Sequence, residues 1–339
     1  MKLSIISSVT EYARDVRSFL NDLKDQDNQD FEIILTLNKS SNNKKTISVI
    51  SEFSNFFGSR LKIIYNSKRQ SQQFNIISAF RICKGDYVTI INSDTSLRKY
   101  YISRMGEVAS RYDVDILEFK PRFVGSIRWK PKARINLSEP VKIANNPEVI
   151  AYSFPFIFNK IFKKSLVKKL EKHKTSSSST DNKFAIELNY LLLLNAKKYM
   201  YYDQRLKREY FDLETWLNPQ GFLTSFNAID PVFKLHSQKV TYEFDYLRAY
   251  FMKLFLPGLL KGTFVFNKQY IFNHKILEQR RGEKIISKLD DIIKKVETTE
   301  AFKIFKETNI YMLKDNKETS LIKKRLDVSE WDDILQELE

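Results

Sequence analysis

The first third of the chain alternates short apolar runs with segments whose apolar residues recur at helical spacing. The run LSIIS is typical of a short buried strand, and FEIILTL is typical of a strand that is covered on both faces. Strands are expected over residues 3–7, 31–37, 61–65, 86–91 and 115–120, and helices over 16–23, 47–57, 74–81 and 99–111. This alternation predicts an α/β fold with a mostly parallel, right-handedly wound sheet that is flanked by helices.

The remainder of the chain favours helices. Residues 158–171 have the pattern of a basic helix, and the polar loop HKTSSSSTDN leads to an apolar helix from residue 183 to about 199. Later helices are expected over 242–255, 282–297 and 300–311, and the acidic segment 326–339 could dock on the basic body as a terminal helix. We therefore expect an α/β domain over residues 1–222 and a helical, basic and aromatic region over 223–339.

Composition limits the classes of function. The 339 residues are 42% hydrophobic, which excludes a disordered scaffold, and a single cysteine excludes an internal disulfide or a thiolate zinc cluster. The net charge is 57 − 41 = +16, with 14% aromatic residues, which suits either nucleic acid or an anionic membrane. Lysine dominates over arginine and lacks the planar fork that reads bases, so the membrane is favoured and no nucleic-acid partner is expected.

No membrane span or cleaved signal is predicted. The most apolar later stretch, 250–266, is interrupted by lysine, proline and glycine, and LSIIS is too short for the core of a signal peptide. We therefore expect a cytoplasmic protein that binds peripherally to the inner face of the cell membrane.

Three strand ends are candidates for a ligand site, because ligands of parallel α/β sheets bind beyond the carboxyl ends of the strands. These ends are residues 7–10, 38–40 and 92–95.

Several motifs in one order resemble the family-two glycosyltransferases of the GT-A fold. They are the first strand and helix, FEIILTL with its polar loop, and KGDYVTIINSDTSL. FNKIFKKSL (158–166) resembles the family's N-K-L-F-K-K-S-L segment, and NAKKYMYYDQRL (195–206) resembles its A-K-K-I-x-Y-I-D-x-P-L segment. The resemblance covers roughly residues 1–215 and implies a GT-A sheet and transfer of a sugar from a nucleotide diphosphate.

The resemblance implies that Asp94 holds Mg²⁺ or Mn²⁺, as the second acid of the family's D-x-D motif. A divalent cation there would stabilise the departing diphosphate. The triplet in this chain is Asn92-Ser93-Asp94, and Asn92 can bind a ribose or sugar hydroxyl but carries no charge. Metal dependence is therefore expected in weakened form, and Asp94 could alternatively serve only as a turn residue.

Other contacts with the nucleotide are implied in the same way. Asn38 stands where the family usually has an aspartate that reads the base, and it could recognise uracil or simply end a strand. Ser8 and Val9 resemble the backbone that contacts the nucleotide. Lys207 and Arg208 could contact the diphosphate or form a solvated basic pair.

An inverting transfer needs a general base, which the family carries in an E-D pair just before a helix. Asp181 matches that place best, although it could also be an N-cap, as could Thr180. Glu187 is the alternative base, or it could only face solvent. The three histidines, His173, His236 and His274, lack the spacing of a metal site and are expected at the surface.

The basic C-terminal region makes the whole chain resemble membrane-associated glycolipid synthases of small wall-less bacteria, which glucosylate or galactosylate diacylglycerol. This implies UDP-glucose or UDP-galactose as donor and diacylglycerol or a glycosyl-diacylglycerol as acceptor. The rings of residues 246–264 could lie in a bilayer interface or form a helical core. Two alternatives remain: a transferase that extends a cell-surface polysaccharide or teichoic-type polymer, and a non-catalytic binding protein with a degenerate site.

Overall fold

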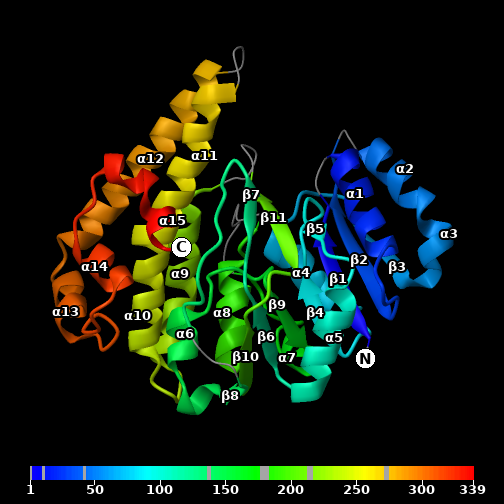
Figure 1. The fold of residues 1–339 in the computed structure, drawn as a ribbon, viewed down its shortest axis with the longest axis horizontal. Coiled ribbons are helices and arrows are strands. Elements are labelled where there is room, and N and C mark those ends of the chain that lie inside the picture. The colour runs from blue at the N-terminus through cyan, green and yellow to red at the C-terminus, as the bar shows by residue number, and fades with distance from the viewer. Residues whose placement is uncertain are drawn as a thin grey trace.

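The protein is an α/β molecule with a large central sheet, as the computed structural model in Figure 1 shows. The structure describes residues 2–9, 12–40, 43–135, 139–175, 183–211, 217–270 and 275–339. The eight strands of the central sheet are β1 Leu3–Ser8, β2 Phe31–Asn38, β3 Leu61–Asn66, β4 Tyr87–Ile90, β6 Ile116–Phe119, β8 Val141–Lys142, β9 Lys160–Lys163 and β10 Lys198–Tyr202. The predicted fold class is confirmed.

The strand order is β3-β2-β1-β4-β9-β6-β10-β8. β1 lies between β2 and β4 and pairs parallel with both, so that Leu3 stands opposite Phe31 and Tyr87. β9 is inserted between β4 and β6 and pairs antiparallel with each of them. The parallel half around β1 therefore sends the ends of β1, β2 and β4 to one edge of the sheet.

Helices cover both faces of the sheet, which explains its continuous apolar strands. On β2, Ile33 packs in a cluster with α1 (Ala13–Lys24), α2 (Asn43–Glu52) and α5 (Tyr101–Tyr112). The next residue, Ile34, packs in the other cluster, together with α4 (Gln72–Phe80), α7 (Lys164–Lys168) and α8 (Ile186–Asn195). The remaining helices of this part of the chain are short: α3 Ser54–Phe57, η1 Gly58–Arg60, η2 Ile143–Asn145 and α6 Glu148–Tyr152.

Two helical predictions are wrong in part. The basic segment 158–171 begins with β9, and only Lys164–Lys168 is helical; Ile161 and Phe162 are both buried, on opposite faces of the sheet. The apolar helix expected over 183–199 begins at Ile186 and ends at Asn195, because Ala196 is extended with ψ 147° and the chain continues into β10.

The C-terminal region is helical, as predicted. Its elements are α9 Pro219–Lys234, α10 Thr241–Tyr250, the π-helical η3 Phe251–Phe255, α11 Leu256–Tyr270, α12 Lys275–Glu297, α13 Glu300–Thr308, α14 Lys317–Lys323, η4 Val328–Asp332 and α15 Ile334–Glu337. α11 and α12 pack side by side (Figure 1). The boundary at residue 222 falls inside α9, and one hydrophobic cluster contains both Ile34 and Leu335, so the two-domain division remains a proposal.

The aromatic rings of this region form core. Tyr246, Tyr250, Phe251 and Phe255 are at most 1% exposed, which favours the core interpretation over a bilayer interface; Phe264 lies outside the described side chains. The acidic terminal segment docks, because Leu335 packs so closely on Gly258 that an added Cβ would lie 2.7 Å from the Leu335 Cγ. Among the described residues, no helix has the length and hydropathy needed to cross a membrane.

A second, three-stranded sheet lies beyond the strand ends. Its order is β5 (Ser96–Leu97), β11 (Lys207–Phe211) and β7 (Phe123–Gly125). β11 pairs antiparallel with β5, so that Arg208 stands opposite Ser96, directly after the segment 92–95. This pairing brings β11 to the predicted site.

Candidate active site

The ends of β1 and β2 meet as predicted. The Val9 N–H donates to the Thr36 carbonyl at 3.0 Å, and the Thr36 hydroxyl donates to the Ser8 hydroxyl at 3.3 Å. Ser8 and Val9 are half-buried at this edge. Their contact with a nucleotide remains a proposal.

The Asn38 amide is occupied by protein partners. Its Oδ1 accepts from Asn66 Nδ2 and from the Gln70 N–H, each at 3.1 Å, and its Nδ2 donates to the Gln70 carbonyl at 3.0 Å. Asn38 therefore does more than end a strand, because it holds the segment that leads into α4. Uracil recognition by its side chain would require these bonds to open.

The centre of the site is Glu209 on β11, which is 1% exposed. One oxygen accepts from Asn92 Nδ2 at 2.8 Å and from Lys183 Nζ at 3.2 Å. The other accepts from Lys207 Nζ at 2.7 Å and from the Thr95 hydroxyl at 2.8 Å. Burial would raise the pKa of Glu209, but the charges and hydrogen bonds of Lys207 and Lys183 lower it to about 2, so this carboxylate is an anion.

Lys183 connects Glu209 to the predicted metal ligand. Its ammonium lies 2.7 Å from Asp94 Oδ2 and 3.2 Å from the Glu209 carboxylate. Burial would lower the pKa of Lys183, but the charges of Asp94 and Glu209 raise it, so the lysine is a cation. Asp94 is thus an ion-pair partner as well as a turn residue, and its side chain is 15% exposed.

Both the nitrogen and the oxygen of the Asn92 side-chain amide are hydrogen-bonded. Besides donating to Glu209, it accepts from Gln72 Nε2 at 3.2 Å at the start of α4, where Ser71 caps the helix. Asn92 is 5% exposed and Ser93 is fully buried. Both lie within the site, but the Asn92 amide is already hydrogen-bonded within the protein.

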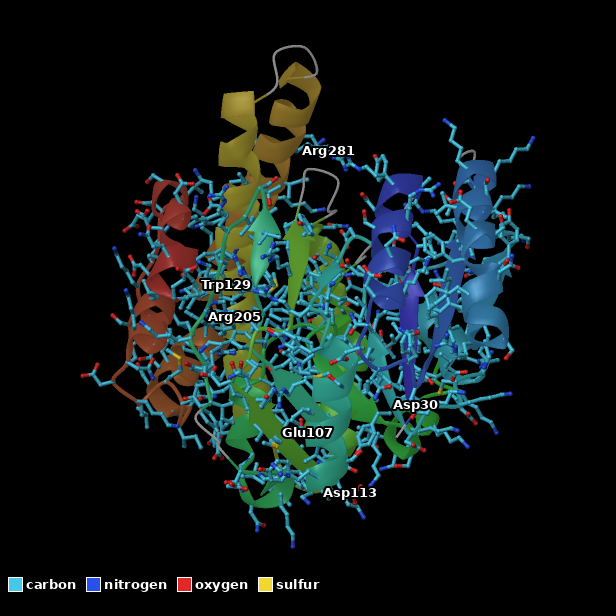
Figure 2. The ribbon with its side chains drawn as sticks, turned by 45° about the vertical axis from the view of Figure 1, so that its right-hand side comes forward. Asp30, Glu107, Asp113, Trp129, Arg205 and Arg281 are labelled. Atoms are coloured by element: carbon cyan, nitrogen blue, oxygen red, sulfur yellow. The ribbon has the colours of Figure 1, made fainter. Side chains whose placement is uncertain are left out.

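Lys207 and Arg208 point to opposite faces of β11, because side chains alternate along a strand. Lys207 is 5% exposed and pairs with Glu209, so it is not part of a solvated basic pair. Arg208 is half-exposed and lies near Arg122, where desolvation and the charges of Arg208, Arg98 and Arg205 lower the pKa of Arg122. Arg205, which Figure 2 labels, donates to the Lys130 carbonyl at 3.1 Å.

These arginines adjoin a pocket of about 490 Å³. Its lining includes Arg122, Arg128 and Lys130, together with one acid, Glu339, whose Oε1 accepts from the Lys130 N–H at 2.6 Å. We use the name Arg122 cluster for the six cations Arg98, Arg122, Arg128, Lys130, Arg205 and Arg208.

The donor set does not fit a divalent cation. Mg²⁺ and Mn²⁺ prefer oxygen ligands from carboxylates, and Glu209 already accepts four hydrogen bonds, two of them from ammonium groups. Asp94 binds the Lys183 ammonium, and Asn92 brings no charge. Within the described ranges, no group of three His, Cys, Asp or Glu side chains could hold a metal ion.

Asp181, the proposed base, lies outside the described residues. The N-cap of α8 is Ala185, in the left-handed region with φ 47°, and Thr180, the other cap candidate, also lies outside the described residues. Glu187 does not face solvent, because it is 2% exposed and lies 2.6 Å from the half-exposed ring of His173. His236 is half-buried, and His274 lies outside the described residues.

The residues that connect this site were not predicted from the sequence. Glu209, Lys183 and Gln72 were not among the predicted site residues, although Glu209 follows the predicted Lys207 by two residues and so shares its face of the strand. Only the pairing of β11 with β5 shows that Glu209 faces the strand ends.

The chain is similar in fold to known glycosyltransferase structures. Residues 1–349 of S. aureus TarS in complex with UDP-GlcNAc superimpose with a TM-score of 0.60 at 14% identity, over 99% of this chain and 91% of that one. A UDP complex of the same fragment gives 0.58 at 15% identity, over 87% and 92%. A longer TarS structure gives 0.58 at 16% identity, over 84% of this chain and 50% of that one, so this chain spans about half of its length. No curated protein matches the chain in sequence.

Residues 4–171 match the family described as glycosyl transferase family 2. The matched range is a little under half of the chain and includes β1, β2, β4 and the segment 92–95. Over residues 4–171 the chain is therefore similar to family 2 glycosyltransferases, and its sheet has a GT-A-like fold.

Proposed function

We propose that the chain transfers a sugar from a UDP-sugar to an acceptor hydroxyl with inversion at the anomeric carbon. The observation that carries the proposal is the buried charged cluster of Asp94, Lys183, Glu209 and Lys207, which lies where β1, β2 and β4 end. A site that holds fixed charges away from water can stabilise the charge that develops on a departing diphosphate. The family 2 match supports an enzyme over a non-catalytic binding protein.

A transfer with inversion requires an acceptor hydroxyl, the anomeric carbon of the donor and a base. The acceptor oxygen attacks the anomeric carbon as the bond to the diphosphate oxygen breaks, UDP leaves, and the acceptor proton passes to a base. Asp181 remains our proposed base. Replacing Asp181 with Asn should lower turnover by roughly 10²–10⁴-fold without weakening UDP binding. Unchanged turnover would transfer the role to another group.

We infer that the acceptor is an anionic cell-surface polymer of the teichoic type. The Arg122 cluster supports this choice, because three of its cations line the pocket and the other three lie close to Arg122 or Lys130. Arg208 of the cluster is on β11, the strand that also carries Glu209. Within the described residues, Arg98, Arg122 and Arg208 have no carboxylate partner. A chain of phosphates or carboxylates is the ligand that such a surface would take.

A lipid acceptor at an anionic membrane is the second candidate. The net charge of +16 favours it, whereas the burial of the aromatic rings of α10 and η3 removes one of its supports. Glucose or galactose remains the proposed sugar, and Mg²⁺ or Mn²⁺ on Asp94 remains a competing proposal for the cation.

One transfer assay tests both acceptors. Purified chain is incubated with labelled UDP-glucose, UDP-galactose or UDP-GlcNAc, and with a teichoic-type polymer, a neutral polysaccharide or anionic vesicles that contain diacylglycerol. We expect label in the anionic polymer. Label in extracted lipid would instead support the glycolipid candidate, and label in the neutral polysaccharide alone would refute the role of the Arg122 cluster.

A further inference from the structure

Lys183 holds a buried positive charge next to Asp94 and Glu209. Its side chain is 7% exposed, and its ammonium bridges Asp94 at 2.7 Å and Glu209 at 3.2 Å. The Phe211 ring lies under it, with the ammonium 5.1 Å from the ring centroid. These contacts fix a cation beside Asp94, the one remaining acid of the family's motif.

The same contacts remove the ligands that a divalent cation would use. Glu209 has both oxygens occupied, by Lys183 and Asn92 on one side and by Lys207 and Thr95 on the other. A divalent ion on Asp94 would have to displace Lys183 or lie next to its positive charge, and like charges in a desolvated site repel strongly. Among the described residues, the two carboxylates of Asp94 and Glu209 are matched in charge by the two ammonium groups of Lys183 and Lys207.

We propose that the Lys183 ammonium stabilises the diphosphate of the donor in place of a divalent metal ion. Lys207 is a positioning residue, because it neutralises Glu209 from the far side and so weakens the competition of that carboxylate with the diphosphate for Lys183. This inference rests on the proposed function. When the bond from the anomeric carbon to the β-phosphate oxygen breaks, that oxygen gains negative charge and accepts a hydrogen bond from Lys183, while Glu209 keeps the ammonium in place.

The first test is UDP binding by the full chain, measured by calorimetry in EDTA and then in Mg²⁺ or Mn²⁺. We expect the UDP affinity to agree within about twofold across these conditions. Loss of binding in EDTA with recovery in either metal would overturn the inference and leave the proposed function standing. Absence of UDP binding in every condition would refute the proposed function itself, and the inference with it.

The second test uses variants with matched burial. Lys183→Met should weaken UDP binding by roughly 10–100-fold, as loss of one charged hydrogen bond does, and should leave uridine binding unchanged because uridine has no phosphate. Lys183→Arg should restore part of the affinity for UDP. Lys253→Met is the control, since Lys253 is also buried and pairs with Glu297 at 2.6 Å outside the site. An equal loss of uridine and UDP binding in Lys183→Met would show that Lys183 acts only through the fold.

Discussion

Two buried clusters in this protein combine a glutamate with lysine, and they differ in their hydrogen-bond partners and in their exposure to solvent. In the core, Glu118 of β6 lies 3.4 Å from Lys160 of β9, and both side chains are fully buried. Glu118 accepts from the Ser153 hydroxyl, the Phe154 N–H and the Tyr199 hydroxyl at 2.6–3.0 Å. The Lys160 ammonium donates to the carbonyls of Phe154 and Phe156 and to the Asn159 side chain. Every partner in this cluster is protein.

The Glu209 cluster is open by contrast. Lys183 lies between two carboxylates, and one of them, Asp94, is 15% exposed at the strand ends. The pKa values follow the same difference: burial lowers the pKa of Lys160 to about 8, whereas the charges of Asp94 and Glu209 raise that of Lys183. A closed cluster of this kind fixes the fold, and an open one with two anions around a cation suits a charged ligand.

The sharpest test of this comparison replaces each glutamate by glutamine. Glu118→Gln and Glu209→Gln should each lower the free energy of unfolding by about 3–5 kcal/mol, because each leaves a buried lysine with less compensation. Only Glu209→Gln should also weaken UDP binding. Urea unfolding and calorimetry measure the two effects, and equal losses of UDP affinity in both variants would remove the distinction between the clusters.

The dependence of stability on pH should identify the closed cluster. Lys160 has a folded pKa of about 8 against 10.5 for an unperturbed lysine, so between these values the unfolded chain binds the proton and the folded chain releases it. Stability contributed by this group therefore rises with pH from about 8 to about 10.5, by about 3 kcal/mol in total. Urea unfolding at several pH values should show this rise in the wild type relative to Lys160→Met, and parallel curves for the two proteins would contradict it.

A smaller effect should distinguish the Arg122 cluster from the Glu209 cluster, which lies on the other face of β11. Arg122→Ala and Arg208→Ala should each weaken binding of an anionic polymer about threefold to tenfold, with a reduced salt dependence, because each removes one contact with a fixed anion. UDP binding should stay unchanged, since Arg208 points away from Glu209. Arg104→Ala is the control, because Arg104 pairs with Glu107 at 3.0 Å on α5. A comparable loss in the control would attribute the effect to net charge alone.

The sequence predicted local structure and the strand ends, because apolar runs such as FEIILTL record burial on both faces. It did not predict β9, since Ile161 and Phe162 lie in a basic segment whose spacing also suits a helix. Glu209 was missed for a related reason. It accepts a hydrogen bond from Asn92, 117 residues earlier, because β11 pairs with β5. No local sequence pattern indicates that pairing.

Asn38 gives the test with the smallest expected effect. It lies at a strand end, like the Glu209 cluster, but its side-chain amide is hydrogen-bonded within the protein, like the Glu118 cluster. Its amide makes three hydrogen bonds to Asn66 and Gln70. Asn38→Ala should therefore lower the free energy of unfolding by about 1 kcal/mol, in the range of net hydrogen-bond contributions, and change uridine affinity less than about threefold. Thermal unfolding and calorimetry with uridine measure both quantities. A much larger loss of uridine binding would show that these bonds open to admit the base, and that saturation by protein does not by itself mark a side chain as structural.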